Sequence, residues 1–460
     1  MKNSFNWTVA CCALLCAGSV MAKDLYVNSA TGDDGVSYAN NSSATPWRSL
    51  GRATWGSTNR DQQNANEAAR AGDVVEVRGS LFSGPATNSR LDPTFNPANS
   101  GTASAPITFR AIGRVELRSP GGTGPVMGAN FRNYIRWEGH FFIDEQYNVP
   151  HSDTGPVVFW DTIGTVIDGC EIEGRNITYI DNHNGVRING AHNSVLRNCR
   201  INNILGTTDN PLHHNNAGVM MYYSDNIIIE NNDISNSGSG IFTKGGDNYN
   251  ITVRFNKLSG NRKAIRNSFS APSTGTNRMY QNVIWNSAQT EMGIDLAENT
   301  NNWIITNNSI NNVQNGFWLE MTGTSGNNQF ANNVIANTNT AMNGWLLTQP
   351  LPGPGRNLYY NTQEWAWNNR TFSTLAAYLL VAPAEIGSLN ANPLFVNLAA
   401  GDMHVQAGSP AIGLGVDILD LNGNGSTTDR IPAGAYVRGN ELIGRNIGPV
   451  PNPPTNVAAQ

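Results

Sequence analysis

The sequence contains little charge and no excess of basic residues. Lys, Arg, Asp and Glu together make up 14% of its 460 residues, against roughly 25% in an average soluble protein. Its 29 basic residues are outnumbered by 34 acidic ones, so the chain lacks the positive field on which nucleic-acid binding depends. We therefore expect neither DNA nor RNA as a partner.

Long apolar runs are also missing, apart from one at the N-terminus. Residues 9–22 form an apolar run that follows Lys2 and ends in the small-x-small pattern Val20-Met21-Ala22, which is typical of a signal-peptidase site. This run is too short to span a bilayer, and no later segment reaches the length of about 18 apolar residues that a membrane span needs. The pattern predicts a signal peptide at residues 1–22 and a secreted protein, extracellular or periplasmic.

Cysteine is the third scarce residue. Of the five cysteines, only Cys170 and Cys199 would remain in the mature chain. Cys16 does not indicate a lipoprotein, because Leu15 stands where a lipidated cysteine is preceded by a small residue. Cys170 and Cys199 occupy the same place in adjacent repeats, so we expect them to stack, but stacking alone does not decide whether a disulfide forms.

Glycine, asparagine and a repeated pattern are abundant. The 47 glycines and the many asparagines favour turns over helix interiors. The repeat has the form Gly-Ø-x-Ø-x, where Ø is apolar, and an alternation with period two predicts β-strands. It begins at Gly185, Gly218, Gly240, Ala264 (in place of glycine), Gly293 and Gly316.

A second repeated position lies roughly 15 residues after each of these patterns. It is preceded at a distance of two residues by Cys170, Cys199, Asn232, Asn256, Asn282, Asn308 and Asn333. Side chains stacked at about 4.8 Å can hydrogen-bond from one repeat to the next, so we expect an asparagine ladder. Units of 22–33 residues with short strands predict an all-β chain that folds as a parallel β-solenoid, because a single coil cannot bury its apolar face alone.

Segments at both ends resemble those of the right-handed parallel β-helix superfamily, which includes polysaccharide lyases. Asp24-Leu25-Tyr26-Val27-Asn28 is similar to the entry segment of secreted proteins akin to family 9 pectate lyases, and Asn392-Pro393-Leu394-Phe395 is similar to their closing segment. The resemblance implies a single-stranded right-handed parallel β-helix at residues 23–448. A Pro-rich tail at 449–460 would follow it.

In such a fold the residues between the apolar positions point outward and form columns about 4.8 Å apart along the surface. The two outward columns are Arg187, Met220, Phe242, Arg266, Asp295 and Trp318, and beside them Asn189, Tyr222, Lys244, Ser268, Ala297 and Glu320. Charged and aromatic side chains gathered on one sheet of a chain with so little charge favour a surface that binds a polysaccharide. The residues that we expect to bind substrate are Arg187, Tyr222, Asp295, Trp318 and Glu320.

Lys244 and Arg266 are the candidate catalytic residues. They stand 22 residues and one coil apart, so their head groups should reach the same sugar. A lyase for uronate polymers needs a base for the proton beside the carboxylate and a cation to stabilise the charge that develops there. The pair resembles the Lys/Arg pair of family 6 lyases acting on alginate and chondroitin sulfate. Ser239 stands where that family has an acidic residue, which leaves the calcium site and the substrate open.

Other interpretations stay open, so a polysaccharide lyase is favoured without its being certain that the protein is an enzyme. Arg266 and Asp295 could form a simple surface ion pair. A glycoside hydrolase would use two carboxylates from the set Asp295, Glu298, Glu291 and Glu320, although the motifs of polygalacturonase-type β-helices are missing. A non-catalytic carbohydrate-binding or cell-surface structural β-helix would keep the aromatic face and need no basic pair.

The insertion at residues 207–216 precedes the strand that carries Tyr222, and insertions in solenoids tend to fall on the binding face. We expect His214 to bind the sugar, with an ordinary loop residue as the alternative. Calcium is the one cofactor considered, and any requirement should be modest because the outward columns contain only Asp295 and Glu320 as acids. No metal site is assigned, and we expect a monomer whose partner is a polysaccharide.

Overall fold

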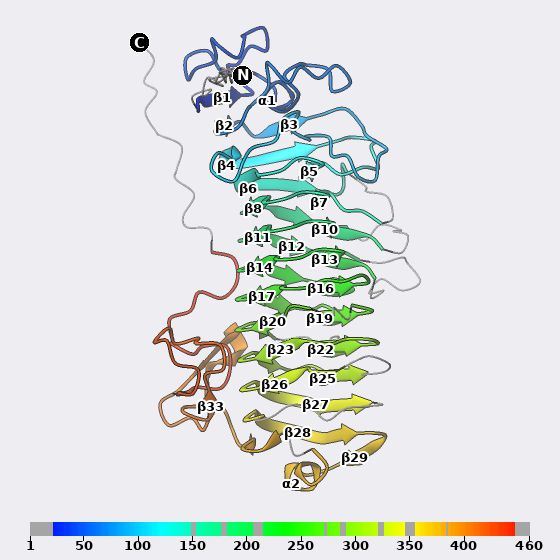
Figure 1. Cartoon of the computed structure of the whole chain (residues 1–460), viewed down its shortest axis with the longest axis vertical. Helices are drawn as coiled ribbons and strands as arrows, with labels where there is room; N and C mark the ends of the chain where they lie inside the picture. Colours follow the sequence, from blue (N-terminus) through cyan, green and yellow to red (C-terminus); the bar gives the residue numbers. More distant parts are fainter. Residues whose placement is uncertain are drawn as a thin grey trace, which may run out of the picture.

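The computed structural model describes residues 22–148, 153–175, 182–205, 215–270, 274–285, 291–320, 326–345, 355–382 and 385–446. The chain winds into a tall stack of coils, and successive coils pair through parallel strands (Figure 1). This is the right-handed parallel β-helix that the sequence predicts. The predicted signal peptide, except its last residue Ala22, and the Pro-rich tail lie outside the described residues.

Each coil in the middle of the stack contributes one strand to each of three parallel sheets. Sheet 1 contains the Gly-Ø-x-Ø-x strands, and its register places Phe242 beside Arg266 and Arg266 beside Asp295, as predicted. Its strands are β5 (Met127–Asn130), β7 (Val157–Trp160), β10 (Asn184–Asn189), β13 (Ala217–Tyr222), β16 (Ser239–Lys244), β19 (Lys263–Ser268), β22 (Met292–Ala297), β25 (Asn315–Glu320) and the ends of β27 (Val334–Trp345) and β28 (Leu358–Trp367).

Sheet 2 follows sheet 1 in each coil. Its strands are β1 (Asp24–Asn28), β2 (Val74–Arg78), the first halves of β4 (Ile107–Arg118) and β6 (Ile135–Asp144), β8 (Val166–Asp168), β11 (Val195–Arg197), β14 (Ile228–Glu230), β17 (Thr252–Arg254), β20 (Asn277–Tyr280), β23 (Trp303–Thr306) and β26 (Gln329–Ala331).

Sheet 3 completes the coil. Its strands are β3 (Leu81–Ser83), the second halves of β4 and β6, β9 (Glu171–Glu173), β12 (Arg200–Asn202), β15 (Asp233–Ser235), β18 (Lys257–Ser259), β21 (Val283–Ile284), β24 (Ser309–Asn311), the starts of β27 and β28, and β30 (Leu389–Asn390).

The apolar positions of the repeat face the interior and stack on their counterparts in the next coil. One such column in sheet 1 is Val186, Val219, Ile241, Ile265, Ile294 and Phe317, and each of these residues is at most 1% exposed. β-Branched residues suit a strand because they fill a pleated surface with few rotamers to lose. Stacking therefore supplies the burial that a single coil cannot.

The asparagine ladder is present and longer than predicted. The side-chain oxygen of Asn282 accepts hydrogen bonds from the backbone and side-chain nitrogens of Asn256 at 3.1 and 3.0 Å, and the pattern repeats through Asn232, Asn308 and Asn333. Asn357 adds a further rung, and its amide donates to the buried carboxyl group of Glu385. Burial raises the pKa of Glu385, although hydrogen bonds from Ser388 and others oppose the shift.

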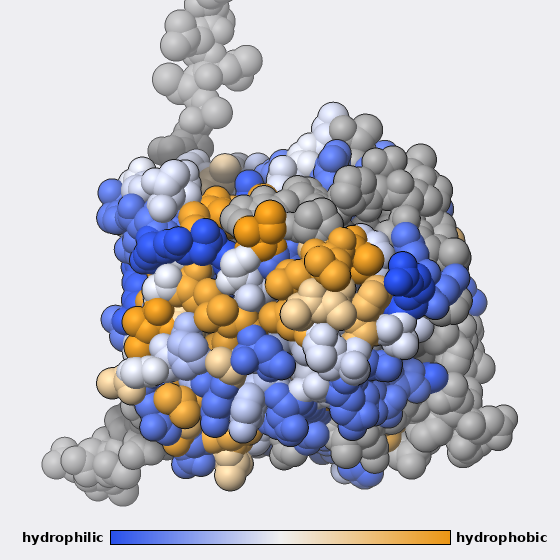
Figure 2. Space-filling view, turned by 90° about the horizontal axis from the view of Figure 1, so that it is seen from below, coloured by the Kyte–Doolittle hydropathy of each residue, from blue (hydrophilic) through white to orange (hydrophobic). Residues whose placement is uncertain are grey.

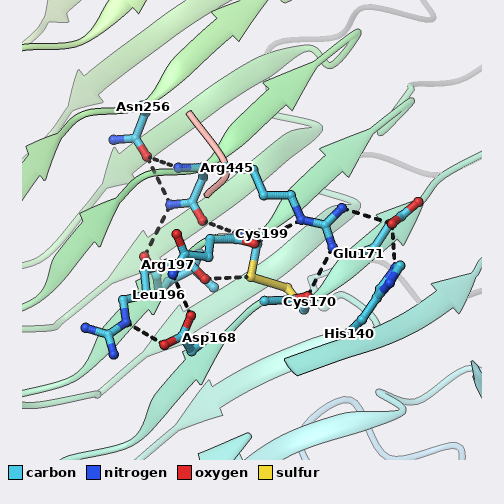
Figure 3. Close-up of a disulfide and its surroundings, with 12 residues drawn as sticks. His140, Asp168, Cys170, Glu171, Leu196, Arg197, Cys199, Asn256 and Arg445 are labelled. Atoms are coloured by element: carbon cyan, nitrogen blue, oxygen red, sulfur yellow. Dashed lines mark hydrogen bonds and ion pairs between the residues drawn. A yellow bond between two sulfur atoms is a disulfide. The ribbon is translucent and has the colours of Figure 1, made fainter. Parts of the chain in front are cut away.

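Cys170 and Cys199 precede the ladder and form a disulfide with Cα atoms 4.6 Å apart (Figure 3). The predicted stacking is thus confirmed, and the bond that the sequence left open joins adjacent coils. Cys199 also begins the ladder, because its backbone nitrogen donates to the Asn232 side chain at 2.9 Å.

In six successive coils, sheets 2 and 3 meet at a turn whose first residue has a left-handed backbone. We name the set Asn198, Asn231, Phe255, Gln281, Asn307 and Asn332 the turn column, and their φ angles lie between 53° and 57°. Asparagine adopts this conformation more readily than most non-glycine residues. The high number of asparagines in the sequence is explained in part by this left-handed position, which recurs from coil to coil.

The ends of the stack are covered by short elements. Helix α1 (Leu50–Trp55) buries all of its residues near the N-terminal coils, and its N-cap Ser49 accepts from the backbone nitrogen of Arg52. β29 (Arg370–Phe372) and α2 (Leu375–Leu379) cover the last coil, where Tyr378 is fully buried. Figure 2 views this end and shows apolar patches among polar residues. No helix in the described ranges is long and apolar enough to cross a membrane.

Residues 391–446 leave the last coil and run back along the outside of the stack, beside sheets 2 and 3 (Figure 1). We name them the C-terminal segment. Its ordered pieces are β31 (Phe395–Asn397), the 3-10 helix η2 (Leu398–Ala400), β32 (Asp402–Val405), β33 (Gly415–Val416) and β34 (Arg430–Ile431). The turn column and the segment are in contact, whereas the strand ends of sheet 1 carry no hydrogen bond to the segment within the described residues.

Candidate functional site

The candidate site is the outer face of sheet 1, built by the strands that begin with glycine. At Gly240 an added Cβ atom would lie 2.5 Å from the carbonyl oxygen of Ala264 and 2.7 Å from Leu258. Only glycine fits where the chain turns into the strand so close to its neighbours. Gly240 thus lets the chain pass close to the next coil, whose strand places Arg266 beside Phe242.

Lys244 is the last residue of β16 and is half-buried. Its Nζ atom donates to the Asn215 side chain at 3.0 Å and lies 5.6 Å from the centroid of the Phe242 ring. The side chain therefore bends back across the sheet rather than extending into solvent, and it lies over the Phe242 ring.

Arg266 lies in the next strand and also lies over the Phe242 ring. Its guanidinium carbon is 4.5 Å from the Phe242 centroid, and its side chain is 11% exposed. Burial lowers the pKa of Arg266, while the charge of Asp295 opposes that shift. Its buried Nη1 atom has no hydrogen-bond partner among the described residues. The structure thus brings the predicted pair together over one aromatic ring, and one buried donor on Arg266 is unpaired among the described residues.

Asp295 lies beside Arg266 and is completely buried. Its Oδ2 atom is 3.1 Å from Nε of Arg266 and 2.7 Å from Nζ of Lys263. Asp295 was expected to bind substrate, with an ion pair to Arg266 as the alternative, and the structure places it in an ion cluster that is buried rather than on the surface. Sequence reasoning missed Lys263, because it precedes the alternating part of its strand.

Arg187 and Tyr222 form the other half of the face. The Arg187 guanidinium lies 4.3 Å from the centroid of the Tyr222 ring and donates to Asn184 at 3.0 Å. Arg187 is 6% exposed, and burial lowers its pKa while the neighbouring Tyr222 and Asp153 oppose the shift. Tyr222 is half-buried and occupies the strand next to that of Lys244, at the equivalent position.

Trp318 and Glu320 lie on the same face but further along the stack. Both belong to β25, three strands from Lys244, and both are half-buried. At about 4.8 Å per strand this separation is about 14 Å, too far for the same sugar but suitable for a neighbouring unit of a polymer. His214 lies outside the described residues.

Three exposed aromatic residues at the edge of sheet 1 were missed. Tyr223 is 62% exposed, Phe131 59% and Phe269 51%, and each follows its strand in a left-handed conformation. An added Cβ atom at Gly246 would lie 2.3 Å from the Tyr223 ring, so this glycine leaves room for the ring. The period-two pattern ends one residue earlier, which explains why it did not find them.

Acidic residues do not gather here into a metal site. Across the described ranges there is no group of three or more His, Cys, Asp or Glu side chains with the geometry to hold a metal ion. Glu291, one of the hydrolase candidates, pairs with Arg262 at 3.0 Å, and Asp295 is engaged by two cations. Calcium therefore stays an expectation drawn from the sequence alone.

Comparisons with known proteins agree with the fold. A family model described as a right-handed β-helix region matches residues 151–270 and 205–349. No curated protein sequence matches the chain significantly.

Similar solved structures include XylC in complex with xylose, at 11% identity, with 81% of this chain and 87% of that chain covered and a TM-score of 0.51. They also include the pectate lyase Pel9A, at 10% identity, with 91% and 98% covered and a TM-score of 0.50. An exopolygalacturonase from Thermotoga maritima aligns at 12% identity over 66% and 86%, with a TM-score of 0.40. At these identities the similarity to XylC and Pel9A shows the right-handed parallel β-helix fold alone.

Proposed function

We propose that this chain binds a uronate-containing polysaccharide along sheet 1 and cleaves it by β-elimination. The observation that carries the proposal is the convergence of Lys244 and Arg266 on the Phe242 ring. Arg187 lies on the same face one strand beyond Tyr222, so two guanidinium groups flank the Lys244 position. An acidic sugar placed there would meet a base and two cations.

In the proposed reaction the neutral amine of Lys244 removes the proton from the carbon next to the uronate carboxylate. The electron pair of that C–H bond forms a double bond to the neighbouring carbon, whose bond to the glycosidic oxygen breaks. The departing oxygen takes a proton from water, so atoms and charge balance.

Arg266 and Arg187 would stabilise the carboxylate as negative charge develops on it. Charge-assisted hydrogen bonds in a partly desolvated site are among the largest contributions to such a reaction. Tyr222, Trp318 and Glu320 would bind the sugars on either side, and the exposed rings of Tyr223 and Phe269 would add stacking surface at the edge. The disulfide between Cys170 and Cys199 supports secretion, because disulfides persist mainly in oxidising compartments.

A non-catalytic glycan-binding protein is the second candidate. Asp295 favours it, because this buried carboxylate already balances part of the positive charge around Arg266. The two candidates differ in one measurable product. The lyase creates a carbon–carbon double bond conjugated to the carboxylate, which absorbs in the ultraviolet.

The test is incubation of the purified protein with polygalacturonate, alginate and chondroitin sulfate while ultraviolet absorbance is followed. An increase with one polymer, lost in Lys244→Ala, supports the lyase. Binding of the polymers without any increase in absorbance favours the second candidate. New reducing ends without absorbance would identify a hydrolase and overturn the proposal.

A further inference from the structure

A groove runs between the turn column and the C-terminal segment, on a different side of the stack from sheet 1. One cavity of about 410 Å³ lies between sheet 2 and residues 419–441, lined by Arg254, Phe255, Tyr280, Arg438 and Glu441 among others. A second of about 390 Å³ continues toward Arg197 and Asn231. Both cavities include Phe255 and Glu441, so they form one groove with Phe255 at its junction.

The turn column shows how the C-terminal segment is held. The side-chain amides of Asn231, Gln281, Asn307 and Asn332 each donate to the segment, for example Asn307 to the carbonyl of Pro432 at 2.9 Å and Asn332 to that of Val416 at 2.8 Å. Asn198 holds it at the far end, where Arg445 donates to the Asn198 carbonyl and to Glu171 (Figure 3). The amides thus fasten the segment coil by coil.

Phe255 is the exception in this column. Its side chain has no amide, and the hydrogen bond that holds the segment at this point, within the described residues, runs from the backbone of Gly444 to the Phe255 carbonyl. Phenylalanine is also a poor choice for a backbone with φ of 56°, a conformation that asparagine adopts at lower cost. Asparagine at this position would tolerate the left-handed backbone and could donate a hydrogen bond to the segment. The phenylalanine is therefore explained better by a role of its ring.

The ring of Phe255 is partly exposed and lines the groove. It meets Tyr280 edge-on, with centroids 6.2 Å apart, and the Tyr280 hydroxyl accepts from Arg254 at 2.9 Å. The Arg254 guanidinium carbon lies 5.4 Å from the centroid of the Phe255 ring, so the pocket presents this ring beside oriented donors and acceptors. This combination, in a cavity of several hundred Å³, is the usual form of a small-ligand site, and flat aromatic faces suit the apolar faces of sugar rings.

The charged side chains of the groove leave no net positive charge. Three arginines line it, Arg197, Arg254 and Arg438, against the four acids Asp168, Glu230, Asp420 and Glu441. Arg254 is paired with Glu230 at 2.6 Å and Arg197 with Asp168 at 2.7 Å. No excess of positive charge remains to attract a polyanion, whereas paired carboxylates and guanidinium groups suit hydroxyl groups, which both donate and accept.

We infer that this groove is a second glycan-binding site, which takes a neutral oligosaccharide with one sugar ring stacked on Phe255. The site is independent of catalysis at sheet 1. Because the groove has no excess of positive charge, it should not bind the acidic polymer that is proposed to bind at sheet 1. It would hold the protein on a second, uncharged polysaccharide while sheet 1 acts on its own substrate.

The test is a calorimetric titration of the Lys244→Ala protein, in which turnover on sheet 1 is blocked, with xylohexaose, cellohexaose, mannohexaose and hexagalacturonate. The key variant is Phe255→Asn, which installs the residue that most of the turn column carries. Phe131→Asn is the matched control, because Phe131 is also an aromatic residue with a left-handed backbone, 59% exposed and at the edge of sheet 1.

We expect at least one neutral hexasaccharide to bind, with an affinity reduced at least tenfold by Phe255→Asn and unchanged by Phe131→Asn. We also expect Phe255→Asn to melt at the same or a higher temperature than its parent. Binding of hexagalacturonate alone, equal affinity in both variants, no binding of any neutral sugar, or a lower melting temperature of Phe255→Asn would each overturn the inference. None of these outcomes bears on the ultraviolet assay, so the two proposals fail separately.

Discussion

Asp295 and Lys263 form a 2.7 Å ion pair across adjacent strands of sheet 1, and the Asp295 side chain is fully buried. Arg266 approaches the same carboxylate oxygen at 3.1 Å. Two cations around one buried carboxylate leave a positive charge in excess beneath the face on which an acidic sugar is proposed to bind. The cluster therefore has both a structural and an electrostatic consequence.

The structural consequence predicts that Asp295→Asn is strongly destabilising. Removing the carboxylate leaves two partly buried cations without compensation, and breaking such a buried pair costs about 3–5 kcal/mol in the free energy of unfolding. Urea unfolding of the purified variant measures this loss. The control is Glu291→Gln, which breaks a more exposed pair to Arg262 and should cost about 0–1 kcal/mol. Similar losses in the two variants would contradict the interpretation of Asp295.

Lys244→Ala is predicted to abolish lyase turnover and to leave the fold intact. A general base contributes roughly 10²–10⁴-fold in rate, and a half-buried side chain at the end of a strand contributes little to stability. Initial rates from ultraviolet absorbance, together with a thermal melt, measure both effects. Lys257→Ala, on the outer face of sheet 3, is the control and should keep full activity. An active Lys244→Ala enzyme would exclude this base.

The asparagine ladder predicts a large cost for one small substitution in the core. Asn282→Ala removes the acceptor for the backbone and side chain of Asn256 and leaves these buried groups unpaired. Each unsatisfied group costs about 1–3 kcal/mol, so we expect unfolding to become easier by about 2–4 kcal/mol. Asn189→Ala, the same exchange at a half-buried outward position of β10, should change stability by less than about 0.5 kcal/mol. Comparable urea midpoints for both would argue against the ladder.

Glu171 gives a pH-dependent prediction at the point where the C-terminal segment is anchored. Hydrogen bonds from His140 and Arg445 lower its pKa to about 2, against the opposing effect of burial. Its pKa is thus lower in the folded state than in the unfolded state, where the ordinary value is 4.5. Its contribution, about 2–3 kcal/mol, should be present above pH 4.5 and lost as the pH falls toward 2.

Unfolding experiments between pH 6 and pH 2 on the parent and on Glu171→Gln measure this contribution as the difference between the two proteins. The difference should be constant above pH 4.5 and shrink below it. Glu138→Gln, which breaks a more exposed pair to Arg110, is the control and should give a small difference throughout. A difference that does not depend on pH would exclude Glu171 as its source.

Much of the fold was predictable because it depends on local, repeated patterns. The alternation beginning at Gly240 fixed which residues face inward, and the register of Phe242, Arg266 and Asp295 follows from it. The ladder position of Asn282 and the stacking of Cys170 on Cys199 follow from the same spacing. For the candidate site, the sequence predicted which residues lie on the outer face of sheet 1, and it placed Lys244 and Arg266 together there. It did not predict the contributions of Lys263 and Tyr223.

By itself the sequence determined the coil, since a period-two pattern repeated every few tens of residues can bury its apolar side chains only by stacking. Tertiary structure decided what each outward side chain does. Asp295 is buried because Lys263 and Arg266 close around it, which no spacing rule contains. The groove at Phe255 exists because a segment about 190 residues later in the chain returns to that coil, as the contact between Gly444 and Phe255 shows. Contacts of this range are set by the path of the whole chain and leave no periodic trace in the sequence.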